Sequence, residues 1–247
     1  MADAGDLPEG WRLASFNSLD STNDEALRLI DAGESHGLVV VADRQLAGRG
    51  RRNAVWRSDP GNLYMTIIVE ISDEAVAGQL AFVAGLAAAD AIDRTVVRKA
   101  DLKWPNDVML EGRKLGGILI EGSNRRGFYA VGLGINIVSA PSGMDTPAIA
   151  LVETGTSTNR DALLAVVCNC FIERWNRWLT SGFPAIRQDW LTRAYGLGQP
   201  LLARLADGTT QRGIFIDVDE AGALMVQRDD GTELVLSAGA VFFNEAS

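Results

Sequence analysis

Short apolar runs and helical spacings alternate along the first 195 residues. Runs of four to eight apolar or alternating residues between turn-forming residues are typical of β-strands, whereas apolar residues three and four apart are typical of amphipathic helices. The expected strands are 11–19, 38–42, 63–71, 99–104, 108–110, 114–120 and 128–137. The expected helices are 23–32, 75–93, 161–179 and 184–195. Residues 138–158 are rich in Ser, Pro, Gly and Thr and are expected to be mostly loop.

Two helices carry further signals. The helix at 75–93 is apolar on nearly every side up to Asp90, which indicates burial of most of its surface. The run from Thr22 to Glu25 has the spacing of a capping box at the start of the helix 23–32.

The pattern changes at Gly196 and Gly198. Beyond them come five short apolar runs joined by turns rich in Asp and Gly, which is typical of a small SH3-like barrel. We therefore expect an α+β protein with two domains. Residues 1–196 would form a mixed β-sheet flanked by helices, and residues 197–247 a C-terminal SH3-like β-barrel.

Composition narrows the class of protein. The chain has 247 residues, of which 47% are hydrophobic and 22% charged, as in soluble globular proteins. With 23 basic and 32 acidic residues, its net charge of -9 argues against a broad surface for nucleic acid or anionic membrane. No apolar run of about 18 residues is found, so no membrane span is expected. The acidic N-terminus lacks an apolar signal region, so we expect a cytoplasmic protein.

Cysteine and histidine are scarce. Cys168 and Cys170 lie two apart on an expected helix and so face different directions, which makes a disulfide between them improbable. His36 is the single histidine, which excludes most zinc sites and any Ser-His-Asp scheme without it. Chemistry must therefore depend on Lys, Arg, Asp, Glu, Asn or backbone groups.

A basic, glycine-rich loop covers residues 45–53. The segment from Arg44 to Arg57, both ends included, contains five arginines and no acidic residue. Glycine lets the backbone approach a ligand closely, and the arginine fork suits phosphate and carboxylate groups. We interpret the segment as a flexible loop that closes over a phosphorylated intermediate. A solvated basic loop without a ligand is the plainer alternative.

Two further segments place charged residues beside apolar strands. The run Lys103-Trp104-Pro105-Asn106-Asp107 ends a strand in a proline turn, and by itself it is an ordinary β-turn. Lys114 then enters an apolar strand next to Gly116 and Gly117. A lysine at the edge of a core is unfavourable unless its charge has a function, and the glycines leave room for a ligand. A turn lysine that faces water is the alternative.

Two more segments have two interpretations each. The glycines of the run from Gly132 to Asn136 could pack against a flat ligand, or they could allow close packing of a buried strand. The run Ser21-Thr22-Asn23 supplies ligand-binding hydroxyls or only a helix cap. No P-loop pattern occurs, so a nucleotide site would be of another type.

In this order, the segments resemble those of the biotin protein ligase family. Each motif alone is weak, but the ordered set is specific and extends from about residue 11 to the end of the chain. Asn53 stands where the family often has Gly, and Gly116 where Ala is more usual. The matching pieces are STN at 21–23, QLAGRGRR at 45–52 followed by Trp56, GNLY at 61–64, KWPND at 103–107, RKLGGILIE at 113–121 and GLGIN at 132–136.

The resemblance implies a biotin/lipoate ligase fold, similar to class II synthetases, and a two-step reaction that forms AMP. Biotin and Mg-ATP would give biotinyl-5′-AMP and pyrophosphate. The biotinyl group would then pass to one lysine of a biotin carboxyl carrier domain, as in acetyl-CoA carboxylase. Because the biotin carboxylate must approach an anionic phosphate, cationic side chains and a Mg²⁺ ion are needed. The ligands of the metal are not assigned.

The resemblance also implies which residues form the site. Lys114, Arg49 and Asp107 are expected to be catalytic, with Asp107 as the base toward the lysine amine. The apolar sheet around Ile118 and Ile135 would hold the hydrocarbon arm of biotin. The expected biotin-binding residues are Ser21, Thr22, Asn23, Gln45, Gly48, Arg49, Gly50, Arg51, Lys114 and Gly117. The expected ATP- or adenylate-binding residues are Arg49, Arg51, Arg52, Trp56, Lys103, Asn106, Lys114 and Asn136.

Some members of the family also carry a DNA-binding winged-helix domain. Only 20 residues precede Ser21, too few for a helix-turn-helix, so we expect a ligase that binds neither DNA nor membrane, as a monomer or homodimer.

Three alternatives stay open. A lipoate or octanoate ligase is disfavoured by the motifs at 45–52 and 103–107 together, and a non-catalytic biotin-binding module by the presence of Lys114 and Arg49. An RNA-binding protein is disfavoured by the acidic charge and the lack of aromatic stacking motifs.

Overall fold

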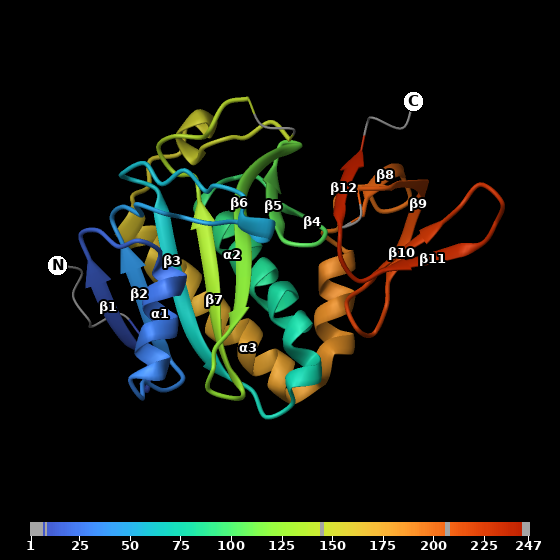
Figure 1. Ribbon diagram of the computed structural model, residues 1–247. Coiled ribbons are helices and arrows are strands. Elements are labelled where there is room, and N and C mark those ends of the chain that lie inside the picture. The colour runs from blue at the N-terminus through green and yellow to red at the C-terminus, as the bar shows by residue number, and fades with distance from the viewer. Residues whose placement is uncertain (1–6, 8, 144–145, 206–207, 244–247) are drawn as a thin grey trace.

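A seven-stranded mixed sheet forms the centre of the protein (Figure 1). The computed structural model describes residues 7, 9–143, 146–205 and 208–243; most of the acidic N-terminus discussed above lies outside this part. The strand order is β1-β2-β3-β7-β6-β5-β4, and only β1 and β2 pair in parallel. The strands are β1 (Arg12–Phe16), β2 (Leu38–Ala42), β3 (Leu63–Glu70), β4 (Asp101–Lys103), β5 (Asp107–Leu110), β6 (Arg113–Gly122) and β7 (Phe128–Ile135). All seven expected strands are present, with ends that coincide with the expected ones or differ by at most three residues, and the mixed sheet is confirmed.

Helix α1 (Thr22–Asp31) connects the parallel strands β1 and β2 and covers one face of the sheet. Ala26 and Ile30 pack there against Val40 and Ile68. The helix begins one residue earlier than expected. Its N-cap is Ser21, whose hydroxyl accepts a hydrogen bond from the Asn23 amide, so the capping box expected at Thr22 is wrong.

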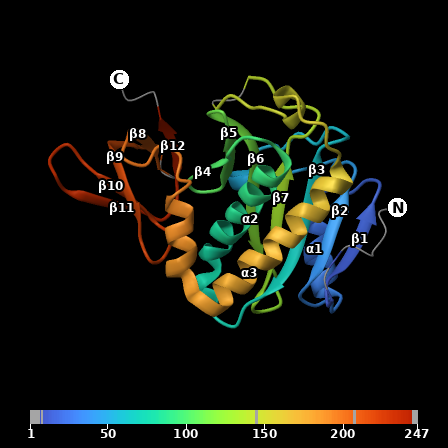
Figure 2. The ribbon, with the colours of Figure 1, turned by 180° about the vertical axis from the view of Figure 1, so that it is seen from behind.

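Helices α2 (Leu80–Thr95) and α3 (Arg160–Leu191) cover the opposite face (Figure 2). A short 3-10 helix, η3 (Glu74–Gln79), leads into α2. Together they make residues 74–95 long and apolar enough to span a membrane by length and composition, although the sequence alone led us to expect no such segment. Because 67% of the apolar window is buried between the sheet and α3, its apolar character is explained by core packing.

Helix α3 joins the two helices expected at 161–179 and 184–195 across a kink. Gly182 departs from helical geometry with a φ of 70°, and Pro184 follows it. Proline lacks the amide hydrogen that a helix interior needs, so a break at this point is expected. Cys168 and Cys170 on α3 are both free, as expected, and both are buried.

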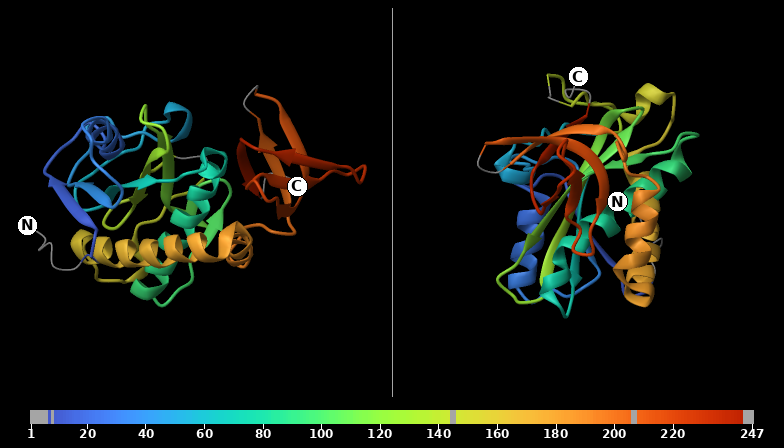
Figure 3. Two further views of the ribbon diagram at one scale, coloured as in Figure 1. Left: turned by 90° about the horizontal axis from the view of Figure 1, so that it is seen from below. Right: turned by 90° about the vertical axis from the view of Figure 1, so that its right-hand side faces the viewer.

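A second, five-stranded antiparallel sheet follows α3 and forms the SH3-like unit (Figure 3). All five expected strands are present. They are β8 (Pro200–Arg204), β9 (Thr210–Val218), β10 (Leu224–Gln227), β11 (Glu233–Leu236) and β12 (Ala240–Phe243), in the order β11-β10-β9-β8-β12.

The second sheet is fastened to the first part of the chain by polar and apolar contacts. The Trp104 indole donates a hydrogen bond to the Gly222 carbonyl at 3.0 Å, and Arg187 of α3 is ion-paired with Asp217 of β9. Gly196 lies at the junction with a φ of +81°, and a Cβ built on it would lie 2.2 Å from the Phe243 ring. The junction therefore requires glycine for both its backbone and its space.

Replacing Gly196 by Ala should destabilise the protein by about 2–4 kcal/mol, because the left-handed backbone and the contact with Phe243 both become unfavourable. Gly198→Ala is the matched control. Its φ is also positive, at +77°, but nothing lies within 4 Å of the added Cβ, so only about 1 kcal/mol is expected. Urea unfolding followed by circular dichroism measures both, and equal losses for the two variants would contradict the packing argument.

Candidate active site

One pocket gathers the motifs that are far apart in the sequence. Its walls come from the start of α1, the loop at 45–56, the turn between β4 and β5, the strands β6 and β7, and residues 239–242 of the second sheet. The predicted site residues that line it are Ser21, Thr22, Asn23, Gln45, Arg49, Gly50, Arg51, Arg52, Trp56, Lys103, Asn106, Asp107, Lys114 and Gly117.

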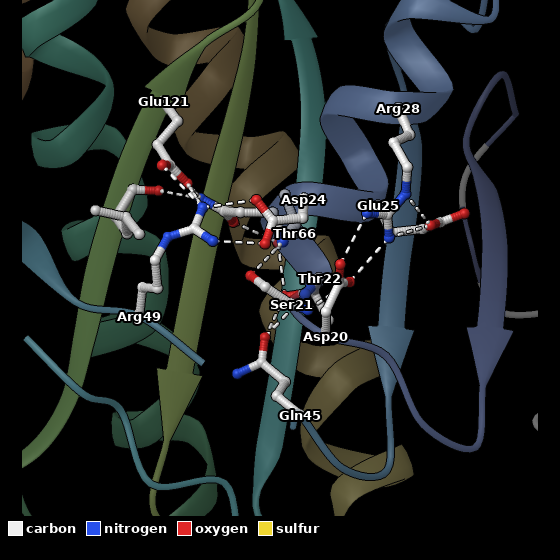
Figure 4. A network of polar contacts seen from close by, with 12 residues as sticks. Asp20, Ser21, Thr22, Asp24, Glu25, Arg28, Gln45, Arg49, Thr66 and Glu121 are labelled. Carbon is white, nitrogen blue, oxygen red and sulfur yellow. Dashed lines mark hydrogen bonds and ion pairs between the residues drawn. The ribbon is translucent and has the colours of Figure 1, made fainter. Parts of the chain in front are cut away.

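At one end of the pocket, buried polar side chains are held in a hydrogen-bond network (Figure 4). The side-chain oxygen Oε1 of Gln45 accepts hydrogen bonds from the Thr22 backbone amide at 2.8 Å and from the Thr22 hydroxyl at 3.1 Å. The hydroxyl of Thr66 on β3 lies 2.9 Å from the Thr22 hydroxyl and 2.6 Å from Asn23 Oδ1. Since these groups fix one another, the network presents oriented donors and acceptors to a polar ligand.

Lys114 projects from β6 into the pocket. Its Nζ lies 2.6 Å from Asp107 Oδ1 and 5.5 Å from the centre of the Trp56 ring. The side chains of Lys114 and Asp107 are only 20% and 17% exposed. A cation at this partly buried position interacts more strongly with an anionic ligand than it would in water. The alternative of a turn lysine that faces water is wrong.

Paired glycines form a flat floor beside Lys114. Gly117 of β6 lies opposite Gly134 of β7, and the Trp56 ring covers both. A Cβ on Gly134 would lie 2.7 Å from the Trp56 ring, and a Cβ on Gly117 would lie 3.2 Å from it. The Trp56 indole nitrogen is buried, and no partner for it is found in the described part of the chain. A ligand that displaced or contacted this indole could satisfy that donor.

The arginines of the 45–56 loop have different environments. Arg49 donates to both oxygens of Asp24 at 2.5 and 2.7 Å and to Glu121 at 3.1 Å, and the hydrogen bonds to Asp24 raise its pKa. Arg51 is half-buried, which lowers its pKa, and its Nη1 donates to the Gly239 carbonyl at 3.3 Å. Arg52 is exposed and has a left-handed backbone, with a φ of 55°.

The turn at 103–107 fixes the opposite wall. The Asn106 side-chain amide donates to the Ile118 carbonyl at 2.6 Å, which ties the turn to β6. Lys103 is buried, with its Nζ 3.1 Å from the Thr146 hydroxyl and 5.5 Å from the centre of the Phe242 ring. The turn is therefore more than a solvent loop, because it holds a buried cation beside the second sheet.

Three predicted residues lie outside the pocket lining. Asn136 is buried, and its amide donates to the Ile149 carbonyl at 3.2 Å, so it ties β7 to the following loop. Gly48 is required for packing, because a Cβ there would lie 2.7 Å from the Trp56 carbonyl. Ile135 is buried in the main core, and Leu133 lines the pocket beside Ile118 in its place. Since residues two apart on a strand share a face, the strand period alone does not decide which of the two reaches the pocket.

Sequence reasoning missed several residues of the site. Asp24 and Glu121 stood in the quoted motifs without a role, and Thr66 was taken only as part of a strand. Gly239 and Phe242 come from the second sheet, about 190 residues from the arginine loop, and no sequence signal marks them. Contacts over such separations follow only from the fold.

No group of three His, Cys, Asp or Glu side chains that could hold a metal ion exists among the residues described. Asp107, Asp24 and Glu121, which lie at or beside the pocket, are each paired with a cation. His36 is away from the pocket, between the rings of Trp11 and Trp175. A metal ion at this site would thus take most of its coordinating atoms from a bound ligand and few from the protein.

Comparisons with known proteins find relatives for both parts of the chain. Residues 15–137 match the model of the biotin/lipoate A/B protein ligase family, and residues 196–244 match the biotin protein ligase C-terminal domain. The chain is 40% identical over 238 residues to a biotin--[acetyl-CoA-carboxylase] ligase of Paracoccus denitrificans, covering 91% of this chain and 97% of that protein.

Two further relatives extend the comparison. The bifunctional ligase/repressor BirA of Bacillus subtilis is 31% identical over 240 residues, which cover 93% of this chain and 73% of that protein. The structure of the biotin protein ligase from Aquifex aeolicus in complex with biotin and ATP superposes with a TM-score of 0.82 at 26% identity. That match covers 94% of this chain and 99% of the other.

Gly134→Ala should displace the Trp56 ring from the glycine floor, because the added Cβ would lie within 2.7 Å of it. Iodide quenching of tryptophan fluorescence should increase, and Trp56→Phe in the same background should abolish the increase. Gly122→Ala is the control, since its Cβ would meet only ordinary contacts at 3.4 Å. Unchanged quenching in Gly134→Ala would contradict the placement of the indole.

Proposed function

The chain belongs to the biotin/lipoate A/B protein ligase family, and on this basis we propose that it is a biotin protein ligase. It activates biotin with ATP and transfers it to a lysine of a biotin carboxyl carrier domain. The observation that carries the proposal is the single pocket in which the hydroxyl network of α1, the arginine loop, the 103–107 turn and Lys114 meet. The relatives named as biotin ligases and the similar structure with biotin and ATP support the choice of substrates.

In the first step, the biotin carboxylate attacks the α-phosphate of ATP and pyrophosphate leaves. Both reactants are anionic, so their approach requires positive charge held in a site that excludes water. Lys114, Arg51 and Lys103 supply that charge, and Arg49 closes the pocket beside them. Thr22 and Gln45 bind the polar head of biotin, while Ile118 and Leu133 contact its hydrocarbon arm.

In the second step, the lysine amine of the carrier domain attacks the acyl carbon of biotinyl-5′-AMP, and AMP leaves. The amine must lose a proton to act as a nucleophile. Asp107 is the carboxylate of the pocket closest to Lys114, at 2.6 Å, and we assign it the role of accepting that proton. The loop at 45–56 keeps water from the reactive adenylate until the carrier lysine arrives.

Magnesium enters this reaction with ATP. A nucleotide-bound Mg²⁺ keeps most of its ligands from phosphate and water and needs only one or two protein carboxylates, which is compatible with the sparse carboxylates at this pocket. Residues 1–196 act as the catalytic domain, and residues 197–247 as a small second domain that completes the pocket wall. The protein works in the cytoplasm as a ligase without a DNA- or membrane-binding role, as a monomer or homodimer.

The proposal predicts biotin-dependent exchange of labelled pyrophosphate into ATP. Reactions with lipoate and octanoate, run in parallel, should give only background exchange, because the polar network around Thr22 and Gln45 is matched to an amide-like head. Exchange with lipoate or octanoate would show that the protein is a ligase for another acid. Absence of exchange with all three acids would favour a non-catalytic binding module.

Lys114→Ala should slow adenylate formation by at least ~100-fold, since it removes a preorganised cation from the reacting phosphate. Single-turnover formation of biotinyl-5′-AMP measures the step directly. Lys99→Ala is a matched control, because Lys99 is exposed and outside the pocket. A Lys114 variant that forms the adenylate at the rate of the Lys99 variant would refute the role.

A further inference from the structure

The first arginine of the loop is held between two carboxylates from different elements. Asp24, the third residue of α1, accepts two hydrogen bonds from Arg49, at 2.5 and 2.7 Å. Glu121, near the end of β6, contacts Arg49 Nη2 with both oxygens, at 3.1 and 3.3 Å. The three side chains are 25–28% exposed. We call this group, Asp24, Arg49 and Glu121, the clasp (Figure 4).

The clasp is attached to the base of a hairpin. The Gly50 amide donates to the Ala54 carbonyl at 2.7 Å, the Trp56 amide donates to the Gly48 carbonyl at 2.9 Å, and Arg49 bridges to Val55. Residues 48–56 are thereby folded back on themselves, with Arg49 at the open end. The carboxylates thus connect this hairpin, which carries Arg51 and Trp56 into the pocket, to α1 and the central sheet.

The clasp also continues into the buried network at the end of the pocket. The Asn23 side-chain amide donates to Glu121 Oε2 at 2.7 Å, and Asn23 Oδ1 lies 2.6 Å from the Thr66 hydroxyl. A Cβ on Gly132 would lie 2.2 Å from Asn23 Oδ1, so this placement of Asn23 requires glycine at position 132. Glu121 is therefore fixed by the same residues that orient Thr22.

The charges in the clasp indicate that Arg49 holds the hairpin in place. Both Nη atoms are committed to carboxylates, and one cation faces two anions, so the group has a net charge of -1. That charge does not favour binding of a phosphate at Arg49. Lys114, Lys103 and Arg51 are further cations that line the pocket. Asp24 has a neighbour with the opposite orientation, since Glu25 pairs with Arg28 on the side of α1 away from Arg49 (Figure 4).

We propose that Asp24 and Glu121 are positioning residues that hold the 48–56 hairpin over the pocket through Arg49. They thereby set how long the activated intermediate is retained, while its formation depends on Lys114. The part concerning the intermediate rests on the proposed function, whereas the holding of the hairpin does not.

The first test uses the ligand-free, full-length protein. Hydrogen exchange of the Gly50 and Trp56 amides, which close the hairpin, should be at least ~10-fold faster in Asp24→Asn and faster still in the double variant Asp24→Asn/Glu121→Gln, by NMR or mass spectrometry. Glu25→Gln, on the same turn of α1, should leave both amides unchanged, and Asp24→Glu should restore most of the protection. Wild-type exchange in the double variant would overturn the proposal. Circular dichroism shows whether each variant is folded, and Glu121→Gln alone, which keeps Asp24, provides a milder variant.

The second test measures biotinyl-5′-AMP. Its single-turnover formation should stay within ~3-fold of wild type in Asp24→Asn, while its release into solution should rise at least ~10-fold. Faster hairpin exchange with unchanged release would overturn the retention role. A loss of formation larger than the rise in release would overturn it as well, because Arg49 would then act on the reacting phosphate. If the wild-type protein forms no adenylate, the proposed function fails, and the hydrogen exchange alone decides whether the clasp holds the hairpin.

Discussion

Gly117 and Gly134 lie opposite each other on β6 and β7, at the centre of the seven-stranded sheet. With no side chains on this part of the two strands, the sheet offers a flat backbone surface on which the Trp56 ring rests. The rest of the pocket is arranged around that surface. Lys114 precedes it on β6, and the 103–107 turn is tied to β6 by Asn106. Any side chain at the two glycines would separate the elements that the site brings together.

Two cations of the site are paired with nearby carboxylates, in a chain whose net charge is -9. The arginine loop contains no acidic residue. Arg49 is ion-paired with carboxylates on α1 and β6, and Lys114 is ion-paired with a carboxylate on β5. Partly buried charges without partners are unfavourable, so these pairings keep the site stable before substrates bind. The cations therefore have two roles. Arg49 holds the loop in place, and the other cations face the pocket.

The second sheet contributes to the site more than its sequence suggests. Gly239 accepts a hydrogen bond from Arg51, and the Phe242 ring lies beside Lys103. The Trp104 indole, at the start of the 103–107 turn, donates to the carbonyl of Gly222. Residues from both sheets form the wall of the pocket. The geometry of the pocket therefore depends on the packing at the junction around Gly196.

The sequence by itself determined the strands, most of the helices and the set of motifs, because hydrophobic period, turn residues and short motifs are local properties. It also singled out Lys114 as a functional lysine, since a charge beside two glycines on an apolar strand is unfavourable unless it serves a ligand. Only the tertiary structure decided which carboxylates hold Arg49, that Asn136 turns to Ile149 and away from the pocket, and that Phe242 completes the wall. It also placed Ser21, in preference to Thr22, at the helix cap, because Thr22 is bonded to Gln45. These outcomes depend on contacts between residues 13 to 139 positions apart, and such contacts exist only once strand order and register have been fixed.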